Sequence, residues 1–141
     1  MAVVSTARTE WQGDLASGEG STALASGVAT LAVNWRARSE GADATTTPEE
    51  LLAAAHASCY SMALSHALTS AGSPPTSLVT DARVTFVPGT GITGIELAVE
   101  GVVPGIDAEA FQAAAEDAKA NCPVSQALSA VPIALVEAVL R

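Results

Sequence analysis

The chain has 141 residues, and its 15 acidic and six basic side chains give a net charge of −9. A charge of that sign repels nucleic acids and anionic membranes, so the composition argues against partners of either class. Apolar residues make up 49% of the sequence and aromatic residues only 4%. The core must therefore be built from Ala, Val and Leu, and the length suits a single domain over residues 1–141.

The N-terminal part predicts short strands. Residues 1–5 lack the basic and apolar regions of a signal peptide. Residues 8–12, 21–26 and 31–36 are short segments separated by glycine, as in a meander of strands. Residues 41–47 have the Gly, Ala, Asp and Thr composition of a loop.

A long helix is predicted over residues 48–71, and it begins with a capping box. We expect the Thr47 hydroxyl to accept from the amide of Glu50, and the Glu50 carboxylate to reach back to the amide of Thr47. Pro48 suits the first helical position, and two acids in the first turn favour the positive end of the helix dipole. The glycine and prolines at positions 72–75 end the helix.

Apolar side chains cover the whole circumference of this helix. A helix that is apolar all round is normally buried all round. Residues 51–68 include two His and three Ser and have no flanking Lys or Arg, so a buried helix is favoured over a membrane span. At 1.5 Å per residue the helix is about 35 Å long, more than so small a domain can enclose. We therefore predict an obligate homodimer with the two long helices at its centre.

The second half of the chain predicts two more strands, a helix and a closing strand. Residues 83–87 and 95–99 alternate large apolar residues with others, which is typical of half-buried strands. Asp107 is expected to cap a helix that runs to about Asn121, before Pro123. Residues 131–140 predict a strand, although the end of that segment is equally compatible with a helix.

Cys59 and Cys122 are the only thiols of the chain. They are compatible with a redox pair, half of a metal site or two inert core residues. A zinc site from His56, Cys59 and Cys122 would lack close-spaced ligand pairs, so His56 is better interpreted as a satisfied polar group at the interface. The flanking residues favour the redox pair. We expect a cytoplasmic protein, in which thiols stay reduced and a disulfide is transient and catalytic.

A series of motifs, in order along nearly the whole chain, resembles the OsmC/Ohr family of thiol peroxidases. Residues 49–64 resemble the signature helix of that family, and Lys119-Ala120-Asn121-Cys122-Pro123-Val124-Ser125-Gln126 resembles its second cysteine motif. Further matches are Trp11-Gln12-Gly13-Asp14, Arg38-Ser39-Glu40-Gly41 and Val103-Pro104-Gly105-Ile106-Asp107. The arginine directly before the helix-opening loop is closer to the OsmC branch.

The resemblance implies an α/β (α+β) fold of OsmC type, an intertwined homodimer whose antiparallel sheets wrap around two long central helices. It implies reduction of organic hydroperoxides to alcohols in oxidative and osmotic stress defence, with no cofactor and no metal. Cys59 matches the peroxidatic cysteine, Cys122 the resolving cysteine, Glu49 the catalytic glutamate and Arg38 the active-site arginine. Arg36, on the same face of the predicted strand, is the rival of Arg38. The reductant would be a dithiol, for which a lipoyl group is one candidate.

This chemistry requires these residue types independently of the family. A thiolate attacks the peroxide and becomes a sulfenic acid, and a second thiol then converts it into a disulfide. A free cysteine is mostly protonated at pH 7, so it needs a neighbouring cation, and arginine stays charged and can contact sulfur and peroxide oxygen together. An apolar pocket would favour alkyl hydroperoxides. A redox-sensing or lipid-like-ligand-binding module without turnover is the alternative function.

The spacing of Glu49 and Cys59 constrains the site. They are ten residues apart on the predicted helix, so about 15 Å separates them along its axis. In a straight helix they cannot share one site, and we expect Glu49 and Arg38 to reach Cys59 from the partner subunit. A break in the helix near residues 53–55 is the alternative.

Overall fold

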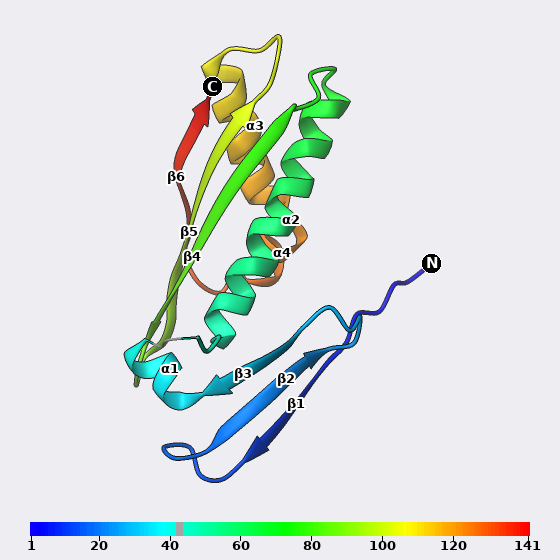
Figure 1. Ribbon diagram of the computed structural model, residues 1–141. Helices are drawn as coiled ribbons and strands as arrows, with labels where there is room; N and C mark the ends of the chain where they lie inside the picture. Colours follow the sequence, from blue (N-terminus) through cyan, green and yellow to red (C-terminus); the bar gives the residue numbers. More distant parts are fainter. Residues whose placement is uncertain (42–43) are drawn as a thin grey trace. The chain divides into compact units, whose positions relative to one another are not determined.

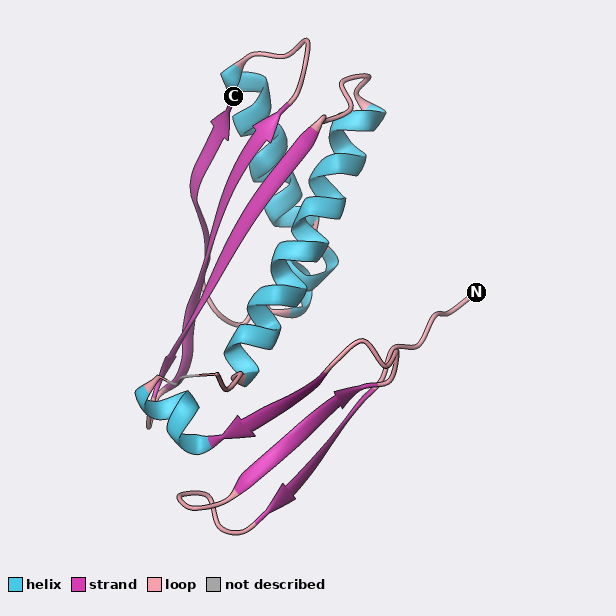
Figure 2. Ribbon diagram, viewed as in Figure 1, coloured by secondary structure: helices cyan, strands magenta, loops and turns pink. Residues whose placement is uncertain are grey.

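The computed structural model describes residues 1–41 and 44–141, and the chain divides into two compact units, Met1–Leu51 and Leu52–Arg141 (Figure 1). The first unit contains three strands, a short helix and the start of the long helix: β1 (Ala7–Gln12), β2 (Glu19–Leu24), β3 (Thr30–Asn34), α1 (Trp35–Glu40) and α2 (Pro48–Ser70). The second contains the rest of α2 together with β4 (Ser77–Val87), β5 (Gly91–Val102), α3 (Ala108–Asn121), α4 (Pro123–Ala127) and β6 (Ile133–Leu140) (Figure 2). The single domain over residues 1–141 stays a prediction.

The first unit is built on an antiparallel sheet in the order β1-β2-β3, so the predicted meander is confirmed. Asp14 fixes the turn between β1 and β2, because its carboxylate accepts from the amides of Ala16 at 2.9 Å and Ser17 at 3.0 Å and from the Ser17 hydroxyl at 2.6 Å. These bonds lower the pKa of Asp14. The ring of Trp11 lies against Gly20 on the neighbouring strand, where a Cβ atom would approach it to 2.9 Å.

The segment after β3 is a helix, and the prediction of a strand through residue 36 was wrong. Asn34 ends the strand and caps α1, since its side-chain oxygen accepts from the amide of Ala37 at 2.7 Å. Residues two apart in a helix point in different directions, whereas in a strand they share a face. Arg36 and Arg38 therefore diverge, and they have different partners.

Helix α2 runs without a break from Pro48 to Ser70, so the alternative of an interruption near residues 53–55 was wrong. Half of the predicted capping box is confirmed, because Thr47 Oγ1 accepts from the amide of Glu50 at 3.0 Å. The Glu50 carboxylate accepts from the hydroxyl of Thr46 at 2.5 Å rather than from the amide of Thr47. The helix ends at Ser70, and Gly72 follows with a positive φ of 85°, which suits glycine after a helix terminus.

The second unit has a sheet in the order β4-β5-β6, with β4 and β5 antiparallel and β5 and β6 parallel. The expectation of purely antiparallel sheets was therefore wrong for β6. The reason is the connection: α3 and α4 carry the chain back to the start of β5, and such a crossover gives parallel neighbours. The closing segment is a strand, not a helix.

The core of the second unit lies between the sheet and helices α2 and α3, which share one face of the sheet (Figures 1 and 2). Helix α2 contributes a stripe at four-residue spacing, His56, Tyr60, Leu64 and Leu68. On its other side Ser58, Met62 and His66 are exposed, and 71% of Met62 is accessible. The opposing core residues come from β5, from α3 and from the residue directly after each of them: Leu97, Val99, Val103, Phe111, Ala115, Ala118 and Cys122.

Gly101 of β5 lets α3 approach the sheet closely. A Cβ atom at this position would lie 2.7 Å from two ring carbons of Phe111, and that ring is fully buried. We expect Gly101→Ala to lower the free energy of unfolding by about 1–3 kcal/mol, because the ring cannot move away without disturbing the core. Urea unfolding of the purified variant measures the loss.

Gly94→Ala is the matched control on the same strand. A Cβ atom there would meet only the carbonyl oxygen of Pro132, at 3.6 Å, which is an ordinary contact. We expect a change within about 0.5 kcal/mol. Equal losses in the two variants would contradict the close-approach explanation.

Candidate active site

The structure brings the two predicted thiols together. Cys59 lies half-buried on α2, and Cys122 lies fully buried between α3 and α4. Both are free thiols, and Cys59 packs against the buried cluster that contains Cys122. The Cys122 thiol and the backbone amide of Val124 are near enough to Cys59 to shift the pKa of its thiol. Two neighbouring free thiols, without a bond between them, are able to form a reversible disulfide.

Cys122 is held by the helices on either side of it. Its amide donates to the carbonyl of Ala118 at 2.9 Å, and its carbonyl accepts from the amide of Gln126 at 3.0 Å. Its own backbone is not helical, with φ −57° and ψ 125°, and Pro123 begins α4 directly after it. The proline predicted to end the second helix therefore also begins the next one. Because Val124 lies in the first turn of α4, its amide has no acceptor within the helix and can donate to Cys59.

The contacts around Cys59 keep its thiol protonated. Burial raises the pKa of Cys59, and so does the hydrogen bond with Cys122, whereas the amide of Val124 lowers it. A nucleophilic thiolate at neutral pH requires a positive charge near the sulfur in addition to these groups.

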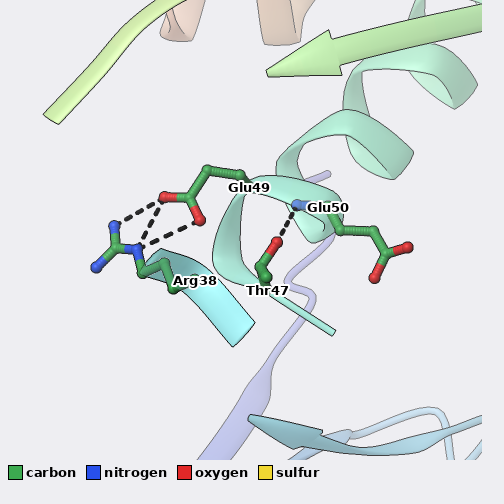
Figure 3. Close-up of polar contacts among 4 residues, drawn as sticks. All are labelled: Arg38, Thr47, Glu49 and Glu50. Atoms are coloured by element: carbon green, nitrogen blue, oxygen red, sulfur yellow. Dashed lines mark hydrogen bonds and ion pairs between the residues drawn. The ribbon is translucent and has the colours of Figure 1, made fainter. Parts of the chain in front are cut away.

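Arg38 and Glu49 form a closely coupled ion pair (Figure 3). The Nε atom of Arg38 lies 3.0 Å from Glu49 Oε1 and 3.3 Å from Oε2, and its Nη2 atom lies 2.8 Å from Oε1. The Glu49 side chain is 7% exposed and that of Arg38 is 33% exposed. A bidentate carboxylate fixes the plane of a guanidinium, so this arginine is oriented before any substrate arrives.

Arg36 has a different environment. Its Nε atom lies 3.4 Å from Glu40 on the same helix, and its side chain is 83% exposed. An exposed pair of this kind holds neither partner firmly. Of the two arginines considered from the sequence, Arg38 is the one paired with the predicted glutamate.

A pair of polar residues beside the thiols was not anticipated. His56, one turn before Cys59, is fully buried, and its Nε2 atom lies 2.7 Å from Oγ of Ser125. Its Nδ1 atom has no hydrogen-bond partner, so the prediction of a satisfied interface histidine was wrong. Tyr60 makes a second buried contact from α2, since its hydroxyl donates to the carbonyl of Ala115 at 2.9 Å.

The described residues give no metal site and no membrane helix. Within residues 1–41 and 44–141, no three His, Cys, Asp or Glu side chains are grouped so that they could hold a metal ion. In the same part of the chain, no helix has the length and apolar character needed to cross a bilayer.

Comparisons with known proteins agree with the family resemblance inferred from the sequence. The family described as OsmC-like protein matches residues 41–136. Proteins named Peroxiredoxin OsmC from Escherichia coli (strain K12) and Shigella flexneri are each 46% identical over 127 residues, which cover 87% of this chain and 88% of the relative.

Solved structures of the same fold include an organic hydroperoxide resistance protein OsmC from Legionella pneumophila, with a TM-score of 0.74, 20% identity and coverage of 98% of this chain and 99% of that one. Another is OhrB of Bacillus subtilis, with a TM-score of 0.69, 24% identity and coverage of 96% and 98%. These likenesses confirm the predicted α+β fold of OsmC type.

His56 predicts how stability depends on pH. Burial lowers the pKa of the folded histidine below its ordinary value of 6.5. Below pH 6.5 the unfolded chain therefore binds a proton that the folded chain does not. As the pH decreases, the free energy of unfolding then falls by at most about 1.4 kcal/mol per pH unit. Above pH 6.5 both states are neutral and this term is absent.

Urea unfolding of the wild type and His56→Gln between pH 7.5 and 5.5 measures this term. We expect the variant to lose less stability than the wild type over that interval. His66→Gln, which changes the exposed histidine of the same helix, is the control and should keep the wild-type slope. A wild-type slope in His56→Gln would refute the assignment.

Proposed function

The chain belongs to the OsmC family, and we propose that it is a thiol peroxidase that reduces organic hydroperoxides to alcohols through Cys59 and Cys122. The observation that carries the proposal is the proximity of the two free thiols, one on α2 and one directly after α3. The relatives named peroxiredoxin, at 46% identity over most of the chain, support the same reaction. The proposal includes a role in oxidative and osmotic stress defence in the cytoplasm.

The reaction takes two steps on the protein. The Cys59 thiolate attacks the distal oxygen of the hydroperoxide, the O–O bond breaks, and the alkoxide leaves as the alcohol after it takes a proton. Cys59 is then a sulfenic acid. The Cys122 sulfur attacks the Cys59 sulfur, the S–O bond breaks, and the hydroxyl group leaves as water with the proton of Cys122. An external dithiol returns two electrons to the disulfide, and a lipoyl group is one candidate.

Arg38 is proposed as the cation that ionises Cys59. Because the pKa of the Cys59 thiol is raised, a neighbouring positive charge is needed to form the thiolate at neutral pH. The bidentate contact with Glu49 supports the choice of Arg38. In this proposal Glu49 orients Arg38 and does not exchange protons with the substrate. A guanidinium beside the sulfur favours the thiolate and also stabilises the negative charge that develops on the leaving alkoxide.

The proposed active unit is a homodimer in which Arg38 and Glu49 of one subunit serve Cys59 of the other. The unbroken helix supports this, because it separates Glu49 and Cys59 by about 15 Å within one chain. Burial supports it as well. Among the described residues of the unit Met1–Leu51, only Thr22, Ala37 and Glu49 are buried, too few for an independent core.

Cysteine variants separate the two chemical steps. We expect Cys59→Ser to abolish consumption of cumene hydroperoxide in the presence of a dithiol, since no nucleophile remains. Cys122→Ser should consume about one equivalent of peroxide and then recycle poorly, because its sulfenic acid has no internal partner. Peroxide loss and the mass of each protein measure both effects. Stoichiometric oxidation of the wild type without turnover would instead support the sensing or ligand-binding module.

Mixed dimers test the shared site. Arg38→Ala and Cys59→Ser are each expected to be nearly inactive as homodimers. In a mixed dimer, one site has an intact Cys59 from the first variant and an intact Arg38 from the second. Refolding the two together in equal amounts should therefore restore about a quarter of the wild-type activity per site. If each subunit used its own arginine, the mixture would stay as inactive as its components.

A further inference from the structure

A buried polar contact joins the helix of Cys59 to the segment of Cys122. His56 precedes Cys59 by three residues, and Ser125 follows Cys122 by three. His56 Nε2 and Ser125 Oγ lie 2.7 Å apart, with 0% and 4% of the two residues exposed. The segment from Cys122 to Ser125 therefore lies beside α2 at two points: Cys122 is next to Cys59, and Ser125 is bonded to His56.

The segment after Cys122 has few other attachments to α2. Helix α4 has only five residues, and Pro123, Gln126 and Ala127 are exposed. Helix α3 is fixed independently, because the Tyr60 hydroxyl donates to its Ala115 carbonyl at 2.9 Å. Among the described residues of α4, Ser125 makes the buried side-chain hydrogen bond to α2.

The cost of the contact argues that it has a purpose beyond packing. His56 keeps Nδ1 buried without a hydrogen-bond partner, an arrangement that apolar residues of the same size would avoid. An apolar pair, however, would not fix the direction and distance between α2 and α4 as a hydrogen bond does.

We propose that His56 and Ser125 are positioning residues for disulfide formation, and this inference rests on the proposed peroxidase function of Cys59 and Cys122. Their hydrogen bond holds the start of α4 against α2, so that the Cys122 sulfur and the Val124 amide stay beside Cys59. While Cys59 is a sulfenic acid, two reactions compete for it. Attack by Cys122 forms the disulfide and water, whereas a second hydroperoxide oxidises the sulfenic acid to sulfinic acid and leaves as the alcohol. Close positioning favours the first.

The redox equilibrium of the Cys59–Cys122 pair tests the inference without a peroxide. The purified protein is equilibrated in dithiothreitol buffers of graded redox potential, and free thiols are alkylated and counted by mass spectrometry. In Ser125→Ala, we expect the disulfide to be at least about tenfold less favoured than in the wild type, which corresponds to a reduction potential about 30 mV higher. A potential equal to that of the wild type would overturn the inference.

Two variants of His56 provide a matched comparison. The amide nitrogen of Gln reaches the position of Nε2, whereas the side chain of Asn is too short to contact Ser125. We expect His56→Gln to keep the wild-type potential within about 10 mV and His56→Asn to behave like Ser125→Ala. The Gln and Asn pair decides the question even if Ser125→Ala fails to fold. Equal potentials in the two His56 variants would count against the inference.

Tyr60→Phe controls for a general loosening of α2. It removes the hydrogen bond to α3 and leaves the contact with α4 intact. Its potential should stay at the wild-type value even if its urea midpoint falls as far as that of Ser125→Ala. A shift as large as that of Ser125→Ala would mean that any loss of packing is sufficient, and would overturn the specific role of His56 and Ser125.

Hydroperoxide kinetics then separate this inference from the proposed function. With excess cumene hydroperoxide, Ser125→Ala should lose its first thiol at the wild-type rate and accumulate more sulfinic acid on Cys59. If Cys59 of the wild type does not react with the peroxide, the proposed function fails, while a shifted potential in Ser125→Ala still supports the positioning role. If Ser125→Ala reacts but accumulates no more sulfinic acid than the wild type, the positioning role is refuted.

Discussion

The unbroken helix α2 is the constraint on which the rest of the site depends. It carries Glu49 in its first turn and Cys59 almost three turns later, and a rigid helix holds these groups about 15 Å apart. The guanidinium that Glu49 orients is therefore tied to one end of the helix, and the thiol to its middle. In the proposed homodimer the two groups of one site come from two chains, and the length of this helix is the reason.

The same helix explains why Cys59 is a protonated thiol within the isolated chain. Burial and the neighbouring Cys122 raise its pKa, and the Val124 amide opposes them only in part. In the proposed mechanism these contacts favour the second step, because a sulfenic acid formed on Cys59 already has its partner thiol nearby. Ionisation for the first step must come from a charge outside this cluster. In the proposed homodimer, Arg38 of the other subunit supplies that charge.

The sequence predicts the elements whose signals are local. Thr47 and Asp107 predict the starts of α2 and α3, and both cap their helices. The alternation of apolar residues predicts β5, where Ile95, Leu97 and Val99 are buried. Helix α1 was missed because Val33 and Trp35, on either side of Asn34, are residue types typical of strands, although Asn34 itself is a good N-cap. The parallel pairing of β6 and the contact of His56 with Ser125 depend on residues far apart in the sequence. No short pattern encodes such contacts, and only the pairing of the two cysteines was accessible through family resemblance.

The two buried hydrogen bonds of α2 attach two different helices beside the thiols. The bond from Tyr60 ends on a backbone carbonyl of α3, whose other backbone contacts are those of a long and regular helix. The bond from His56 ends on a side chain of α4, a helix too short to be stable without tertiary contacts. In the proposed cycle, the segment that carries Cys122 moves as its thiol passes from the resting state to a disulfide, because a disulfide has a specific geometry. One polar anchor on a short helix permits that movement and limits its extent, whereas tight apolar packing along its whole length would oppose it.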